Sequence, residues 1–224
     1  MVEMGDNDDI EGGSGGGNVA CVMEAIVWLR HEQTNTELIS SSNHHRLGER
    51  KKGMESVVLR TESVGLHNVF VYGSLQAEEV VEVLLKRIPQ TLPATLNNYH
   101  RFSIKRRVYP AILPVEDKKV TGKVLSGITD PELLVLDAFE DVEYERRTVD
   151  VTLTDTSEKL QVYTYVWCNS TDPDLYGEWD LEEWKKVHMK DFVKMTMGFA
   201  EELEHPEAKP RVEAYESFYH QDKK

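Results

Sequence analysis

The sequence of 224 residues is poor in cysteine, in basic residues and in long apolar runs. Its two cysteines, Cys21 and Cys168, are too few for a disulfide framework or a cysteine-rich zinc site, which fits a reducing, cytoplasmic setting. No stretch approaches the roughly 18 apolar residues that span a membrane. The 26 basic residues stand against 40 acidic ones, giving a net charge of −14. Because nucleic acids and anionic membranes bind local positive charge, the composition argues against both as partners.

Three common functional signatures are also missing. No Gly-x-x-x-x-Gly-Lys-[Ser/Thr] phosphate loop occurs in the chain. Ser74 follows Gly73, but the second glycine of the Gly-x-Ser-x-Gly nucleophile turn is absent. His44 and His45 are adjacent and lack a partner at metal-ligand spacing. The sequence therefore argues against a phosphate-loop enzyme, a serine hydrolase and a histidine metal site.

Composition divides the chain into three parts. Residues 1–65 are expected to form a flexible acidic and Gly/Ser-rich extension, whose one short apolar segment at 19–29 is expected to pack as a helix on the domain or on a partner. Residues 66–204 carry the apolar patterns of a folded domain. Residues 205–224 are expected to form a polar C-terminal tail.

The apolar patterns in 66–204 predict an α+β domain. Asp130 followed by Pro131 predicts one helix start, and Asp180 predicts another. Most strands follow one another through short turns, which predicts a mostly antiparallel or mixed curved sheet closing into a small barrel with flanking helices. His188 falls on the apolar stripe of the last helix, where a packed histidine is the simpler interpretation. The expected strands are 69–71, 92–104, 107–114, 120–128, 147–154 and 160–167, with a polar turn at 116–119, and the expected helices are 77–88, 131–139 and 181–204.

The first candidate site is the turn after the first strand. The apolar run ends at Val71, and Gly73 and Ser74 lead almost at once into a helical pattern. This geometry points backbone N–H groups at one spot, which suits an anion or a developing oxyanion. A strand–turn–helix unit without any ligand is the alternative, and by itself the pattern favours it.

The second candidate is Glu140, at the C-terminal end of the 131–139 helix. The helix dipole and the apolar neighbours Phe139, Val142 and Tyr144 would raise its pKa toward the range of a general base. The alternative is that Glu140 and the acids after it are solvated and balance the arginines that follow. From composition alone, this alternative is the simpler one.

The two candidate stretches belong to a series of short motifs along the chain. The motifs are Val71-Tyr72-Gly73-Ser74-Leu75, Tyr109-Pro110-Ala111-Ile112, Leu136-Asp137-Ala138-Phe139-Glu140 and Tyr144-Glu145-Arg146-Arg147-Thr148-Val149. In this order and spacing they resemble the gamma-glutamylcyclotransferase-like superfamily. The resemblance covers about 68–204, and residues 175–180 with Glu183 and Trp184 are similar to the plant AIG2-like branch.

The resemblance implies a gamma-glutamylcyclotransferase, an acyltransferase-type enzyme that needs no metal or cofactor. The α-amine of a γ-glutamyl group attacks its own γ-carbonyl and releases 5-oxoproline with an amine or amino acid. The alternative is a catalytically inactive binding module of the same fold that acts in defence-related signalling by protein contacts. The resemblance implies a small-molecule partner and leaves the acceptor and the oligomeric state open. It implies Glu140 as the proton acceptor and a substrate-binding loop of Tyr72, Gly73, Ser74, Leu75 and Gln76.

Overall fold

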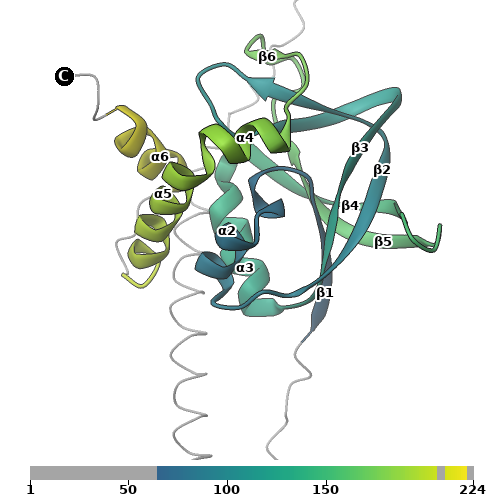
Figure 1. Cartoon of the computed structure of the whole chain (residues 1–224), viewed down its shortest axis with the longest axis horizontal. Helices are drawn as coiled ribbons and strands as arrows, with labels where there is room; N and C mark the ends of the chain where they lie inside the picture. The colour runs from purple at the N-terminus through teal and green to yellow at the C-terminus, as the bar shows by residue number, and fades with distance from the viewer. Residues whose placement is uncertain (1–64, 206–209, 221–224) are drawn as a thin grey trace, which may run out of the picture.

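Five strands close into a barrel, and the helices gather on one side of it (Figure 1). The computed structural model describes residues 65–205 and 210–220, so the expectations for 1–64 lie outside the described residues. The strands follow the order β3-β1-β5-β4-β2, and pairing of β2 with β3 closes the ring. Only β1 and β5 pair in parallel among these strands. They are β1 (Leu66–Val71), β2 (Gln90–Ile104), β3 (Ala111–Thr129), β4 (Tyr144–Leu153) and β5 (Lys159–Trp167), and the short β6 (Leu175–Tyr176) extends β2.

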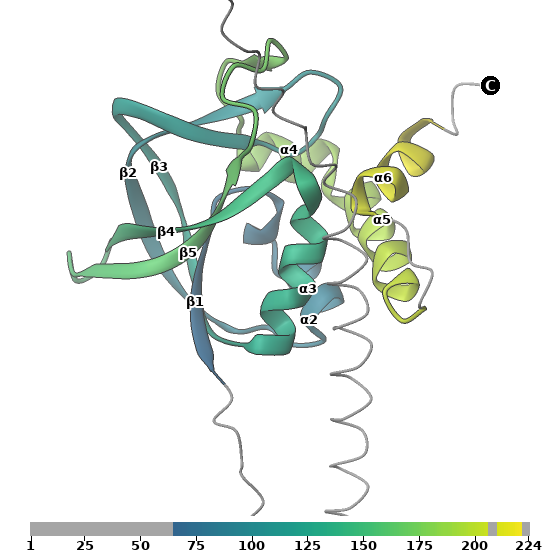
Figure 2. The same ribbon diagram turned by 180° about the vertical axis from the view of Figure 1, so that it is seen from behind.

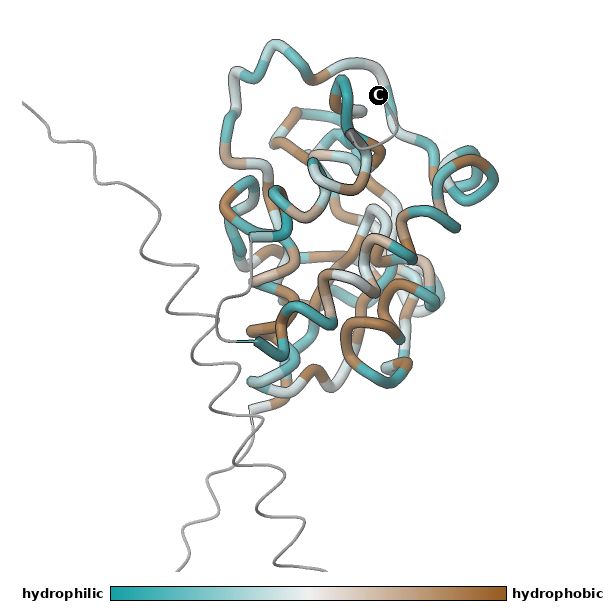
Figure 3. The backbone as a smooth tube through the Cα atoms, turned by 90° about the vertical axis from the view of Figure 1, so that its left-hand side faces the viewer, coloured by the Kyte–Doolittle hydropathy of each residue, from teal (hydrophilic) through white to brown (hydrophobic). Residues whose placement is uncertain are grey.

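The predicted fold class is confirmed, and the predicted β4–β5 hairpin is present. Hydrophobic and hydrophilic positions are interspersed along the tube in Figure 3, as half-buried strands and helices require. No helix among the described residues is long and apolar enough to cross a membrane. The helices are the one-turn η1 (Ser74–Gln76) and η2 (Asp141–Glu143), with α2 (Glu78–Leu85), α3 (Asp130–Glu140), α4 (Leu181–Val187), α5 (Met189–Glu202) and α6 (Arg211–His220).

The polar run at 116–119 lies inside β3 and does not form the predicted turn between two strands. Asn97 of β2 pairs with Lys119 of β3, and Tyr99 pairs with Pro114. The single residue Asn98 therefore lies opposite the four β3 residues between those two pairs. This bulge explains the exposed, turn-like composition of a segment that continues the strand. The separate strands predicted at 107–114 and 120–128 therefore belong to one continuous β3 that begins at Ala111.

One boundary of α2 and one of α3 differ from the prediction. Helix α2 ends at Leu85 because Lys86 adopts a left-handed conformation, which leaves Ile88 exposed outside the helix. The N-cap of α3 is Thr129, in a capping box with Glu132, instead of the predicted Asp130.

The helix predicted at 181–204 is divided at His188 into α4 and α5, although Asp180 caps its start as expected. The apolar spacing continues across the break because both helices pack on the same core. His188 lies half-buried at the junction.

The stretch predicted to be a polar tail contains helix α6. Arg211 and Tyr215 in this helix are 2% and 1% exposed, so the ordered part of the chain continues past the domain end expected near Glu204.

Strands β1 and β3 lie close together at Gly122. A Cβ at this position would overlap the carbonyl oxygen of Val71 and lie 2.8 Å from the Phe70 ring. Gly122→Ala is therefore expected to lower the free energy of unfolding by about 3 kcal/mol, measured by urea denaturation. Gly198, inside α5, has open space around it, and Gly198→Ala should raise the same quantity by about 0.5–1 kcal/mol. Equal effects of the two substitutions would contradict the close approach.

Candidate active site

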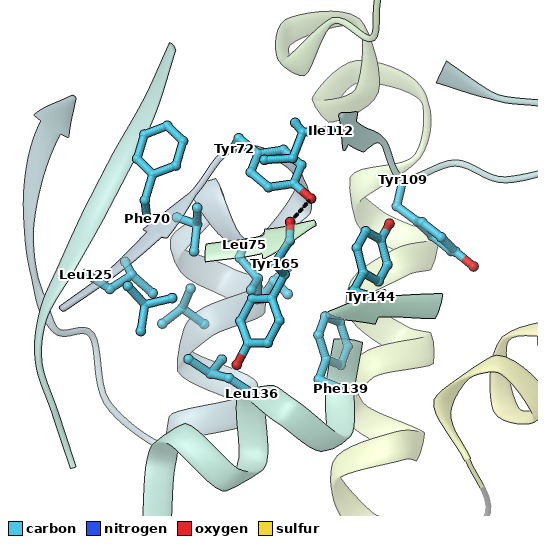
Figure 4. Close-up of a cluster of buried hydrophobic side chains, with 14 of the residues drawn as sticks. Phe70, Tyr72, Leu75, Tyr109, Ile112, Leu125, Leu136, Phe139, Tyr144 and Tyr165 are labelled. Carbon is cyan, nitrogen blue, oxygen red and sulfur yellow. Dashed lines mark hydrogen bonds between the residues drawn. The ribbon is translucent and has the colours of Figure 1, made fainter. Parts of the chain in front are cut away.

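A pocket lies where the end of β1 meets the end of α3. The space between its lining residues, with the open solvent at its mouth, amounts to about 420 Å³. Figure 4 shows aromatic members of its lining, which come from distant parts of the chain. The lining residues are Phe70, Val71, Tyr72, Gly73, Ser74, Leu75, Tyr109, Pro110, Phe139, Glu140, Tyr144, Tyr165, Phe192 and Arg211.

The lengths of β1 and α3 bring the two candidate stretches together. Leu66, at the start of β1, pairs with Thr129, the residue before α3. The six residues of β1 rise about 20 Å and the eleven residues of α3 about 16 Å. Because α3 runs alongside β1 (Figure 2), both elements end near the same place. The turn at 73–75 therefore meets Glu140.

The turn after β1 is tightly held from outside the pocket. The Tyr72 carbonyl accepts hydrogen bonds from Arg101 Nη1 and Gln76 Nε2, both at 2.8 Å. In a trans peptide the C=O and the following N–H point in opposite directions, so the Gly73 N–H points away from these side chains. Neither Arg101 nor Gln76 lines the pocket. Gln76 thus holds the loop from behind, and direct contact between its side chain and a substrate stays a prediction.

Tyr72 connects two strands of the barrel. Its hydroxyl donates to the Tyr165 carbonyl at 2.6 Å, the bond that is dashed in Figure 4. Burial raises the pKa of Tyr72 well above its ordinary value, and the charge of Glu140 raises it further. The neutral hydroxyl is thus occupied within the fold, while its neighbours Gly73, Ser74 and Leu75 line the pocket beside it.

Glu140 is the last residue of α3, and its side chain reaches the pocket. Burial raises its pKa from 4.5 to about 7, and the nearby charges of Glu143 and Asp137 act in the same direction. The Arg211 charge opposes them. Of the residues that the structure describes, none donates a hydrogen bond to the Glu140 carboxylate. Near neutral pH this carboxylate can therefore both accept and return a proton.

Two further carboxylates flank Glu140, and both are occupied by partners. Asp137 accepts from the Tyr165 hydroxyl at 2.8 Å and from Arg146 Nη1 at 2.5 Å. Glu143 accepts from the Tyr109 hydroxyl at 2.7 Å. Of these three carboxylates, Glu140 is the one that lines the pocket. Among residues 65–205 and 210–220, no group of three His, Cys, Asp or Glu side chains is placed to hold a metal ion.

Sequence reasoning missed several lining residues. Tyr109 and Tyr144 lie in the quoted motifs but received no role there. Arg211 was missed because its segment was assigned to a polar tail. A weak signal was present: Val212, Tyr215 and Tyr219 keep helical spacing, which favours a packed helix.

Comparison with known proteins places these residues in a family. The family model for "Gamma-glutamyl cyclotransferase, AIG2-like" matches residues 69–186. AIG2-like protein D of Arabidopsis thaliana is 65% identical over 147 residues, covering 65% of this chain and 97% of that protein. AIG2-like protein C of the same plant is 60% identical over 156 residues, covering 70% and 91%.

A solved structure agrees with the sequence comparisons. The solution structure of an Arabidopsis thaliana protein, 52% identical in sequence, aligns with a TM-score of 0.50 and covers 59% of this chain and 89% of that one. The matched segment 69–186 contains both the turn after β1 and Glu140. The chain therefore belongs to the gamma-glutamyl cyclotransferase, AIG2-like family.

Proposed function

We propose that this protein is a gamma-glutamylcyclotransferase, which converts a γ-glutamyl amide into 5-oxoproline and a free amine or amino acid. The observation that carries the proposal is Glu140, a carboxylate with a pKa of about 7 in a pocket lined by the turn at 73–75. Family membership supports the same reaction class.

In the proposed reaction, Glu140 accepts a proton from the α-ammonium group of the substrate. The freed amine nitrogen attacks the γ-carbonyl carbon and forms the five-membered ring, and negative charge collects on the carbonyl oxygen. The bond to the leaving nitrogen then breaks, and protonated Glu140 returns its proton to that nitrogen. The ring nitrogen still carries two protons at this point, and the Glu140 carboxylate accepts one of them and passes it to the released amine, which leaves as an ammonium ion. Both protons lost by the α-nitrogen therefore end on the leaving nitrogen, and no proton is gained or lost over the cycle.

The turn after β1 would supply donors for this charge. Gly73, Ser74 and Leu75 precede or begin η1, where backbone N–H groups have no partner within the helix. Such donors stabilise an oxyanion or the α-carboxylate without reorganising during the reaction. Because the nucleophile is intramolecular, holding the substrate folded provides effective molarities up to about 10⁵–10⁸ M. The aromatic lining would exclude water around the reacting atoms.

The proposal is tested by 5-oxoproline release from a panel of γ-glutamyl amines and γ-glutamyl dipeptides. Release from at least one member is expected, and the preferred member identifies the leaving group. Thermal unfolding with added 5-oxoproline provides an independent measure, because a ligand of the native state raises the melting temperature. Binding of the panel without release from any member would contradict the enzyme and favour a binding module.

The pH profile is expected to follow Glu140. Since the carboxylate form accepts the proton, kcat/KM should rise as pH increases through about 7, the pKa of Glu140 in the folded protein. Initial rates of 5-oxoproline release between pH 5 and 9, in buffers of constant ionic strength, measure this limb. A profile that is flat across pH 6 to 8 would show that another group accepts the proton.

A further inference from the structure

Helix α6 lies outside the family-matched segment 69–186, yet its first residue reaches the candidate active site. Arg211 is 2% exposed and lines the pocket beside Glu140. Its Nε donates to the Phe139 carbonyl at 2.7 Å, and its Nη2 donates to Glu143 Oε2 at 3.0 Å. One guanidinium therefore contacts α3 immediately before Glu140 and η2 shortly after it.

Helix α6 also bonds Asp141, the residue that follows Glu140. Asp141 has φ 58° and ψ −165°, a conformation that is favourable only for glycine and costs other residues about 1–3 kcal/mol. Its carboxylate accepts from the N–H of Val142 at 2.7 Å and from the N–H of Val212 at 3.0 Å. The second bond comes from α6. Strained turns persist only where their surroundings fix them, and α6 provides part of that surrounding.

The site suits the planar shape of arginine as well as its charge. The guanidinium carbon of Arg211 lies 4.4 Å from the centre of the Tyr109 ring and 5.8 Å from that of Phe139. Lysine would supply a positive charge, but it has no planar group to stack on the rings, and all its donors lie on one nitrogen, whereas arginine donates here from Nε and Nη2. Geometry and charge can therefore be separated by substitution.

We propose that Arg211 is a positioning residue for Glu140 and that the start of α6 is an integral part of the active site. By bonding the last turn of α3, Arg211 and Val212 fix the direction in which Glu140 leaves the helix. The functional half of this inference rests on Glu140 as the proton acceptor of the proposed reaction. The structural half, control of the Glu140 carboxyl by α6, does not depend on catalysis.

The charge on Glu140 responds to groups from every element around it. Arg211 on α6 is the cation among them and favours the ionised form. Asp137 on α3 and Glu143 on η2 disfavour it. The neutral tyrosines that face it are Tyr72 after β1, Tyr144 on β4 and Tyr165 on β5. Removing the Arg211 charge should therefore raise the pKa of Glu140.

Two substitutions of Arg211 separate its roles. In Arg211→Met the pKa of Glu140 should rise by about 1 or more, because a nearby opposite charge is lost. In Arg211→Lys the pKa should stay near the wild-type value, while kcat for 5-oxoproline release falls about 10²-fold with little change in KM. The ¹³C carboxyl shift of Glu140, assigned by its absence in Glu140→Gln, measures the pKa without requiring turnover.

Arg107 provides a matched control. Like Arg211, it pairs with Glu143, and its guanidinium carbon lies 5.2 Å from the centre of a tyrosine ring, that of Tyr215. It contacts neither the Phe139 nor the Glu140 carbonyl. Its other partner is Glu216 on α6, so Arg107→Met should change kcat and the pKa of Glu140 in the same direction as Arg211→Met but by much less.

Asp141→Gly tests the same inference if the variants of Arg211 do not fold. Glycine accepts the strained conformation, so this variant should fold, yet it loses the bond to Val212 and should lower kcat. Circular dichroism establishes the folded state of each protein. Wild-type kcat and Glu140 pKa in folded Arg211→Met, Arg211→Lys and Asp141→Gly would overturn the inference, as would an equal loss in Arg107→Met. If the wild type releases no 5-oxoproline, the proposed function fails, while the carboxyl titration still decides whether α6 controls Glu140.

Discussion

Replacing Glu140 by glutamine is expected to abolish 5-oxoproline release and to leave the fold intact. The amide matches the carboxylate in size but cannot accept the ammonium proton or return it to the leaving nitrogen. A general acid–base group contributes about 10²–10⁴-fold to a rate, so turnover should fall at least that far. The measurement is 5-oxoproline formation by equal concentrations of folded wild type and variant. Wild-type turnover in Glu140→Gln would remove Glu140 from the mechanism.

The stability of the same variant provides the control, because Glu140→Gln should lower turnover but raise the melting temperature at alkaline pH. The pKa of Glu140 is raised from 4.5 to about 7 in the folded state, so the folded protein binds this proton more tightly than the unfolded chain. The free energy of unfolding therefore falls as pH rises from about 4.5 to about 7. Glutamine has no such dependence. Glu140→Gln should melt above wild type at pH 8 and close to it at pH 4, and a lower melting temperature at pH 8 would contradict the buried carboxylate.

Gly73→Ala is expected to damage both activity and stability. A Cβ on Gly73 would lie 2.8 and 2.9 Å from the ring carbons of Pro110. The Pro110 carbonyl accepts from the Tyr144 hydroxyl at 2.7 Å, so displacing Pro110 also moves a residue of the lining. Turnover should fall about 10²-fold, and the free energy of unfolding by about 1–3 kcal/mol.

The comparison with Glu140→Gln separates the two effects. In Gly73→Ala, both the free energy of unfolding measured in urea and the rate of 5-oxoproline release should fall. In Glu140→Gln, only the rate of release should fall. Gly198→Ala, with open space at its Cβ, controls for the general effect of adding a methyl group. Full turnover in Gly73→Ala would mean that the loop and Pro110 move apart at no cost to the site.

Local sequence patterns were sufficient to predict those elements whose structure is determined by neighbouring residues. Strands β4 and β5 alternate apolar and polar residues because one face of each meets the core, so their hairpin was predictable. Glu140 was also predictable as a candidate, because it breaks a helix-dipole preference among apolar neighbours. Both signals lie within a few residues of the feature that they predict.

Features decided by distant partners were not predictable. Arg211 is buried because the Phe139 carbonyl and Glu143 satisfy its donors, and neither is near it in sequence. The bulge in β3 resembles a turn because its residues have no core on either side. Likewise, the aromatic walls of the pocket come from five separated segments, which only the closed barrel brings together.

The parallel pairing of β1 with β5 has a consequence for how the molecule folds. The β2–β3 and β4–β5 hairpins can form from neighbouring chain segments, whereas Val69 must find Tyr163 across most of the domain. Such non-local pairing is slow because closing a long loop costs chain entropy before the stabilising contact has formed. The bond from Tyr72 to Tyr165 depends on the same closure. We therefore expect the hairpins to acquire hydrogen-exchange protection first during refolding and the candidate active-site pocket to form late.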